Sequence, residues 1–128
     1  MRIENKCAGV IFTSESISEE DKSKLRKEEI VVYDIFIKEF NKDEIIREII
    51  NVFEFPIEYR RYINWDSFEE SLNDLSWIEG RKIAVFLYDS TRAWRDAYSE
   101  MSLLHNIIMM AALHHKRNGR DLIWFFVA

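Results

Sequence analysis

The chain has 128 residues, of which 48% are hydrophobic and 14% aromatic, with three glycines and one proline. So many apolar side chains exclude a disordered chain and suffice for one hydrophobic core, so we expect a single domain over residues 1–128. The single cysteine, Cys7, excludes an internal disulfide framework and a multi-cysteine metal site, and it favours a reducing, cytoplasmic location. The sequence shows neither a secretory signal nor a stretch apolar enough to span a membrane.

The net charge of −5 is unevenly distributed along the chain. Between Tyr62 and Gly80 the sequence has five acidic residues and no basic one. These acids are Asp66, Glu69, Glu70, Asp74 and Glu79. Because a concentrated negative charge repels nucleic acid and attracts basic proteins, we expect a basic protein partner and no nucleic acid.

The first predicted elements are a strand, a charged segment and a second strand. Residues 7–13 form a short apolar run that is typical of a strand. Residues 18–29 are highly charged, with Leu25 as their one large apolar side chain, which fits either a solvated helix or a mobile arm. The run IVVYDIFI at 30–37 again predicts a strand.

A helix with isoleucines at helical spacing comes next. It is expected to begin at Asn41 or Lys42 and to be stopped by Pro56, because proline cannot continue a helix. Residues 57–63 are rich in tyrosine and arginine and predict an irregular connection.

The second half of the chain repeats the alternation of strand and helix. The apolar run at 82–89 is typical of a strand covered on both faces, and the apolar run at 121–128 predicts a final strand. Helical segments are expected between them, through Asn118, with Gly119 as the residue that ends the last helix. One buried face is predicted on that helix, formed by Leu103, Leu104, Ile107, Ile108 and Ala111. The pattern predicts an α/β fold with a small, mostly parallel sheet of three to four strands and helices packed against it.

The acidic residues belong to the segment NWDSFEESLNDLSW at 64–77, which reads as one amphipathic helix with a tryptophan at each end. On a helical wheel, Trp65, Leu72 and Leu75 lie on the side of Phe68 and form the core face. The opposite, solvent-facing side holds Asp66, Glu70 and Asn73. A binding surface and an ordinary solvated face both remain open; in the second, Asp66 would be the N-cap and Glu69 its capping-box partner.

The segment FPIEYRRYINWDSFEESLNDLSW at 55–77 resembles the barstar family, the intracellular inhibitors of barnase-type ribonucleases. The shared features are Phe-Pro at a helix end, Asn-Trp-Asp, an acidic residue six positions after the asparagine, and Asp-Leu-Ser-Trp. The resemblance covers residues 30–128, and residues 1–29 loosely resemble the additional strand and helix of longer members.

The resemblance implies that this helix and the loop before it block a nuclease active site, as in an antitoxin or immunity protein. Glu70 would lie where the RNA phosphate binds, and Asp66 would take the neighbouring acidic role. Asn64 and Trp65 would flank them, with an aromatic contact from Tyr59. We include Glu69, Asn73 and Trp77 in the predicted partner-binding set, although Trp65 and Trp77 fit a core role equally well.

The sequence also departs from the family pattern. The key acidic position usually holds aspartate, and here it holds Glu70, which is one methylene longer. The loop before Asn64 is longer than in the best-known member and contains Arg60 and Arg61. The segment HHKRNG at 114–119 is basic or neutral where that member offers acids. A different nuclease, or a non-nuclease partner on the same fold, is therefore the alternative.

No catalytic constellation is recognisable in the sequence. It has no glycine-rich phosphate loop, nucleophile elbow or acid–base pair placed in a cleft, so we predict a protein that is not an enzyme. The adjacent His114 and His115 point about 100° apart on a helix and lack a nearby carboxylate, so no metal is predicted. No cofactor is expected, and the free chain is expected to be a monomer.

Overall fold

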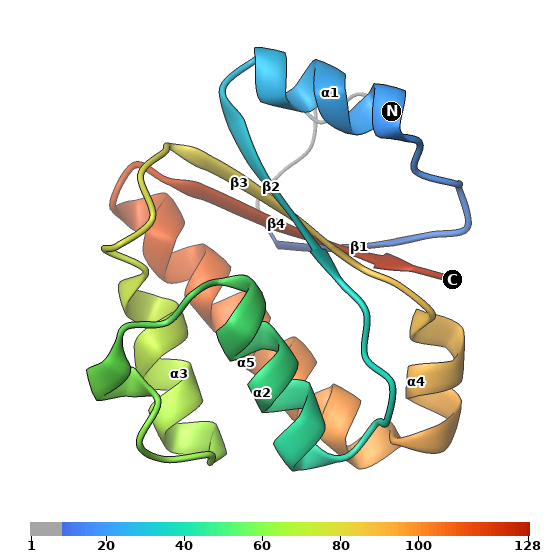
Figure 1. Cartoon of the computed structure of the whole chain (residues 1–128), viewed down its shortest axis with the longest axis vertical. Helices are drawn as coiled ribbons and strands as arrows, with labels where there is room; N and C mark the ends of the chain where they lie inside the picture. Colours follow the sequence, from blue (N-terminus) through green and yellow to red (C-terminus); the bar gives the residue numbers. More distant parts are fainter. Residues whose placement is uncertain (1–8) are drawn as a thin grey trace.

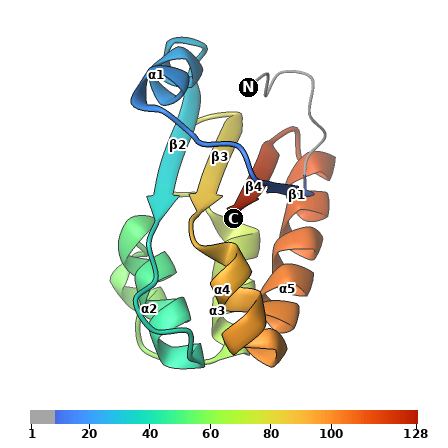
Figure 2. The same ribbon diagram turned by 90° about the vertical axis from the view of Figure 1, so that its right-hand side faces the viewer.

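Four parallel strands form one sheet in the computed structural model, which describes residues 9–128. The strands are β1 (Gly9–Thr13), β2 (Ile30–Ile35), β3 (Lys82–Leu87) and β4 (Asp121–Val127). They lie side by side in the order β1-β4-β3-β2 (Figure 2). The predicted α/β fold with a parallel sheet is confirmed. The central strands β3 and β4 are almost continuously apolar because other strands border them on both edges and helices cover both faces.

The strand order explains where the helices lie. The helices are α1 (Glu19–Lys27), α2 (Lys42–Val52), α3 (Trp65–Asp74), α4 (Ser90–Asp96) and α5 (Tyr98–Arg117). The chain crosses from β1 at one edge to β2 at the other and then returns through β3 to β4. Right-handed crossovers place the connecting helices on opposite faces for these two directions. Accordingly, α1 lies on one side of the sheet and α2, α3 and α5 lie on the other (Figure 1).

The larger hydrophobic core lies between the sheet and the helices α2, α3 and α5. Ile45, Ile46 and Ile49 of α2 are fully buried there, and Asn41 caps this helix with its side chain. Helix α2 ends at Val52, before Pro56, as expected. In α5 the predicted buried face is confirmed at Leu104, Ile107, Ile108 and Ala111, and Met101 belongs to it as well. Leu103 is 46% exposed, which corrects the expectation that it is buried.

Residues 18–29, which fitted either a helix or a mobile arm, contain helix α1. Leu25 packs into a second core on this face of the sheet. Lys22 is only 6% exposed, and its Nζ donates a hydrogen bond to Asp34 Oδ2 of β2 at 3.0 Å. Tyr88 donates to Asp34 Oδ1 at 2.8 Å. Burial alone would lower the pKa of Lys22, but its hydrogen bonds to Asp34, Tyr88 and Glu19 raise that pKa above its usual value, so the lysine stays charged.

Candidate protein-binding site

The acidic helix α3 begins at Trp65 with Asn64 as its N-cap. Asn64 Oδ1 accepts a hydrogen bond from the backbone N–H of Ser67 at 2.8 Å. The interpretation of Asp66 as N-cap, with Glu69 as its capping partner, is therefore wrong. Asp66 lies one position inside the helix, in its first turn, where the positive end of the helix dipole stabilises a carboxylate.

Helix α3 is held against α5 and the core on one side only. Phe68 and Leu72 are buried at 2% and 0% exposure, as the helical wheel predicted. Ser71 is also buried, and its hydroxyl donates to the backbone oxygen of Ser67 at 2.9 Å. His115 of α5 donates from Nε2 to the backbone oxygen of Leu72 at 2.9 Å. These contacts fix the rotation of α3, and therefore the direction in which its acidic side points.

The C-terminal end of α3 is shorter than predicted. The helix stops at Asp74 because Leu75 adopts a left-handed conformation with φ of 46°. Trp77 lies in the turn that follows and is not part of the helix, which corrects the expectation of one helix over 64–77. Arg120, directly before β4, holds this turn by donating hydrogen bonds to the backbone oxygens of Leu75, Ile78 and Gly80 at 3.0, 2.8 and 3.1 Å.

The outward side of α3 carries three acids that have no partner within residues 9–128. Asp66 and Glu70 are exposed and Glu69 is partly exposed. Within residues 9–128, none of these three carboxylates makes an ion pair or a side-chain hydrogen bond with the protein. Asp66 and Glu70 are one helical turn apart, so their charges reinforce each other. The geometry therefore presents a protruding double negative charge instead of a recessed acid–base pair.

Tyr59 and Asp74 form a fixed pair beside these acids. Tyr59 ends the short 3-10 helix Ile57–Tyr59, and its hydroxyl donates to Asp74 Oδ2 at 2.6 Å. This hydrogen bond raises the pKa of the Tyr59 hydroxyl and lowers the pKa of the Asp74 carboxyl. At neutral pH the tyrosine is therefore neutral and the aspartate charged. The bond ties the loop before α3 to the last residue of the helix.

The remaining predicted residues, Trp65, Asn73 and Trp77, are each partly buried. Trp65 packs edge-on against Phe68, with ring centroids 5.9 Å apart. Trp77 donates from Nε1 to the backbone oxygen of Phe53 at 2.8 Å, which joins the turn after α3 to the end of α2. Asn73 was expected on the solvent side, but its amide oxygen is buried without a hydrogen-bond partner. All eight predicted residues thus lie on α3 or in the segments that flank it.

His115 of α5 contacts this helix and was not among the predicted binding residues. In the sequence it was considered only as part of the basic or neutral segment 114–119 and as a metal ligand, but its side chain is 3% exposed and contacts α3. Burial lowers its pKa, and the charges of Arg120 and His114 lower it further, whereas the bond to Leu72 raises it. Helical spacing could have predicted the burial of His115, because residue 115 lies four positions after Ala111 and seven after Ile108, both of which are on the buried face.

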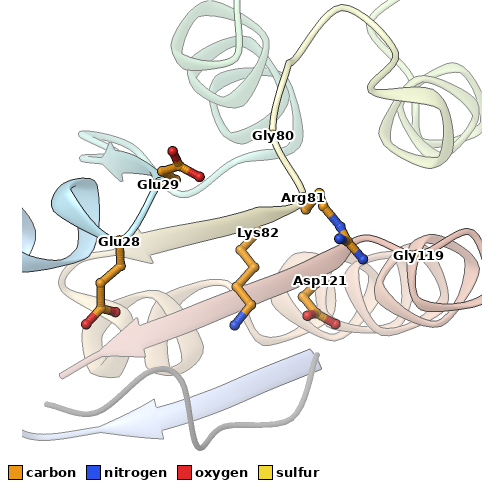
Figure 3. Close-up of a pocket in the computed structure, with 7 residues that line it drawn as sticks. All are labelled: Glu28, Glu29, Gly80, Arg81, Lys82, Gly119 and Asp121. Atoms are coloured by element: carbon orange, nitrogen blue, oxygen red, sulfur yellow. The ribbon is translucent and has the colours of Figure 1, made fainter.

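A groove where β3 and β4 begin does not include any of the predicted binding residues (Figure 3). It has a volume of about 480 Å³. Its lining consists of Glu28, Glu29, Gly80, Arg81, Lys82, Gly119 and Asp121. Charges of both signs alternate around it, and Asp121 is paired with Lys116 at 3.0 Å. No excess of one charge selects a ligand there.

Among residues 9–128, no group of three or more His, Cys, Asp or Glu side chains is arranged to hold a metal ion. No helix in the same part of the chain is long and apolar enough to cross a membrane. Cys7, noted in the sequence, lies outside the described residues.

Comparison with known proteins identifies the class to which this fold and helix belong. The model of the family described as Barstar (barnase inhibitor) matches residues 36–127. The chain therefore belongs to the barstar family, as the motif at 55–77 indicated. The matched part contains α2 to α5, β3 and β4, while β1, α1 and β2 precede it. No curated protein sequence matches the chain.

Proposed function

We propose that this protein inhibits a ribonuclease of the barnase type, as an antitoxin or immunity protein, by placing α3 over the nuclease active site. The observation that carries the proposal is the pair of exposed carboxylates Asp66 and Glu70, which have no cationic partner within residues 9–128. The proposed contact set consists of Tyr59, Asn64, Trp65, Asp66, Glu69, Glu70, Asn73 and Trp77.

The proposed mechanism is a stoichiometric blockade in which no bond is made or broken. A ribonuclease must bind the RNA phosphate with basic side chains, and a carboxylate at the same place satisfies those side chains. Glu70 is the residue that would occupy the phosphate position, with Asp66 one turn away. Hydrogen bonds between charged groups strengthen when the interface excludes water, so the complex gains most where the acids are central.

The shape of α3 supports an inhibitor over an enzyme. A hydrolase would need its two carboxylates in a cleft that encloses the substrate, whereas Asp66 and Glu70 protrude from the outer side of a helix. The same protrusion lets them enter a cleft on another protein. The fixed Tyr59–Asp74 pair and the Asn64 cap hold both ends of the helix, so little order has to be gained on binding.

The decisive variant is Glu70→Ala, measured against barnase-type ribonucleases. We expect it to weaken binding by at least about 30-fold, the loss typical of a central hot-spot residue. The thermal midpoint should stay within a few degrees of the wild-type value, because an exposed side chain without partners contributes little to the free energy of unfolding. Inhibition titrations and thermal unfolding measure the two quantities.

The matched control is Glu39→Ala, which removes another exposed glutamate, one that makes no ion pair within residues 9–128, from the loop before α2. It should leave binding unchanged to within about twofold, because it removes the same single negative charge at a place away from α3. If both variants bind as the wild type does, α3 does not contact the nuclease. If the wild-type protein binds no ribonuclease of this type, the proposal is wrong, and the alternative of a partner that is not a nuclease takes its place.

A further inference from the structure

A second charged feature lies next to α3 and has the opposite sign. A groove of about 420 Å³ runs between α2 and the loop that leads to α3. It is lined by Arg47, Ile50, Asn51, Arg60, Arg61 and Ile63, which we call the arginine groove. Three of these six residues are arginines and none is acidic. Its volume falls in the range of about 300–1,000 Å³ that is usual for sites holding small groups.

One of the three arginines is already fixed in place. Arg60 donates from Nε to the backbone oxygen of Phe55 at 2.6 Å and from NH1 to Asn51 Oδ1 at 3.4 Å. The first of these bonds crosses the turn after α2, and the second reaches back to that helix. Arg60 therefore holds the loop against α2 and keeps a positive charge at the groove without having to lose side-chain freedom on binding.

The other two arginines have no partner within residues 9–128. Arg47 and Arg61 are exposed, and neither makes an ion pair or a side-chain hydrogen bond there. Asp43, one turn before Arg47 on α2, lies 3.8 Å from Lys42 instead. Three arginines that line one groove repel one another, and their charges, like those on the acidic side of α3, have no oppositely charged partner within residues 9–128.

The position of the groove links it to α3. Ile63 lines the groove and the next residue, Asn64, caps α3, so Asp66 in the first turn is three residues away along the chain. A protein that covers the start of α3 also reaches the groove. We propose that the arginine groove receives a carboxylate side chain of the protein partner. The partner then carries an acidic residue beside the basic cleft that α3 enters. Only the partner's identity rests on the function proposed above.

The chemistry favours a carboxylate on a protein over a nucleic acid. A guanidinium group offers paired N–H donors that match the two oxygens of a carboxylate or a phosphate. A single acidic side chain places one charge in the groove and nothing beyond it. An RNA strand would have to continue past the groove with a charge at every phosphate, close to Asp66 and Glu70, and these acids repel it. The adjacent negative helix therefore selects against the polyanion.

The test uses the protein alone, so that it does not depend on any nuclease. The arginine Nε–H signals are followed by NMR while a capped hexapeptide of five glycines and one glutamate, called the glutamate peptide, or hexauridylate is added at the same concentration. We expect the glutamate peptide to shift the signals of Arg47, Arg60 and Arg61 and to leave the signal of Arg26 on α1 unchanged. Hexauridylate should shift them at least threefold less. An equal or larger effect of the RNA, or no effect of the peptide, overturns the proposal.

A charge-matched pair of variants locates the binding. Arg47→Glu with Arg61→Glu should weaken binding of the glutamate peptide at least tenfold. Arg26→Glu with Lys27→Glu makes the same change in net charge on the far side of the sheet and should leave it within about twofold of wild type. Equal losses in both double variants would mean attraction by net charge only, which overturns the groove as a site.

The outcome is separable from the function proposed for α3. Glu70→Ala should leave the shifts caused by the glutamate peptide in place, since Glu70 is not part of the groove. Against a ribonuclease that the wild type binds, the groove variant should bind at least tenfold more weakly, while the Arg26 and Lys27 variant binds as wild type. If Glu70→Ala weakens that complex and the groove variant does not, only the arginine groove is refuted.

Discussion

Glu70 and Asp66 illustrate how a residue can be placed well for binding and poorly for the stability of the free chain. They lie at i and i+4 on α3, where like charges destabilise a helix by about 0.2–0.5 kcal/mol. The helix dipole offsets this cost for Asp66 in the first turn but not for Glu70 in the middle. When a partner places cations against this position, the attraction between these cations and the two carboxylates outweighs the repulsion between Asp66 and Glu70.

The length of the Glu70 side chain leads to the first residue-level prediction. Glu70→Asp withdraws the carboxylate by about 1.3 Å, roughly half of a hydrogen-bond length, while keeping its charge. A charged bond stretched by that amount is lost or filled with water. We expect the swap to weaken binding to the true target more than tenfold, about 1.4 kcal/mol, and to improve binding to a barnase-type enzyme that prefers aspartate.

Titrating both nucleases with both versions of the inhibitor gives four affinities and one coupling free energy. A coupling near zero, with both affinities shifted equally, would show that Glu70 sets no preference. Discrimination would then have to come from the arginine groove or from the basic end of α5.

For single residues, the sequence was most informative where helical periodicity alone determines whether a side chain is buried or exposed. The helical wheel separated Phe68 and Leu72, which are buried, from Asp66 and Glu70, which are exposed. It was misleading for Asn73, whose side chain was expected on the solvent side but whose amide oxygen is buried. The N-cap was also misassigned: Asn64 and Asp66 are both good capping residues, and only the backbone conformation distinguishes them.

At the scale of elements, apolar runs and helical spacing predicted the strands and helices because these signals are local. The end of α3 could not be predicted in this way. Leu75 adopts a left-handed conformation that a leucine rarely takes, and Arg120, 45 residues later in the chain, stabilises the turn by binding its backbone oxygens. Contacts made over such separations leave no local pattern. The same reason hid the link between His115 and Leu72.

The contact between α3 and α5 leads to a pH prediction. Burial lowers the pKa of His115 in the folded protein below its unfolded value of about 6.5. The folded state therefore binds the proton less readily than the unfolded state. The contribution of neutral His115 to the free energy of unfolding is fully present above pH 6.5, and the free energy of unfolding falls as the pH drops below this value. One titrating group limits this slope to about 1.4 kcal/mol per pH unit.

His115→Gln is the matching variant, because a glutamine amide can still donate to Leu72 and carries no titrating group. Chemical denaturation between pH 5 and 8 should show a steeper loss of stability toward acid in the wild type than in the variant. Parallel profiles for the two proteins would mean that His115 does not couple to folding. A wild type that becomes more stable toward acid would contradict the sign of the pKa shift.

At the scale of the whole molecule, two groups of like charge lie close together along the chain. The acidic side of α3 and the arginine groove each lack an oppositely charged partner within residues 9–128, while the net charge of the chain is −5. Such a surface orients a partner as well as attracting it, since only one orientation matches both signs. Charge-steered association is best known from the barnase–barstar pair itself, so that behaviour is expected from the family.

The final prediction concerns the rate at which the complex forms. Five acids between Tyr62 and Gly80, with no base among them, produce a field that accelerates encounter with a basic nuclease. Ions screen this field over a Debye length of about 10 Å at 0.1 M salt and about 3 Å at 1 M. Stopped-flow association should therefore slow at least about tenfold between low and high salt, with a much smaller change in the dissociation rate. The double variant Glu70→Ala with Asp66→Ala should show a smaller change of the association rate with salt concentration. If the wild-type rate is constant with salt, the acids act only after contact, and electrostatic steering has no part in binding.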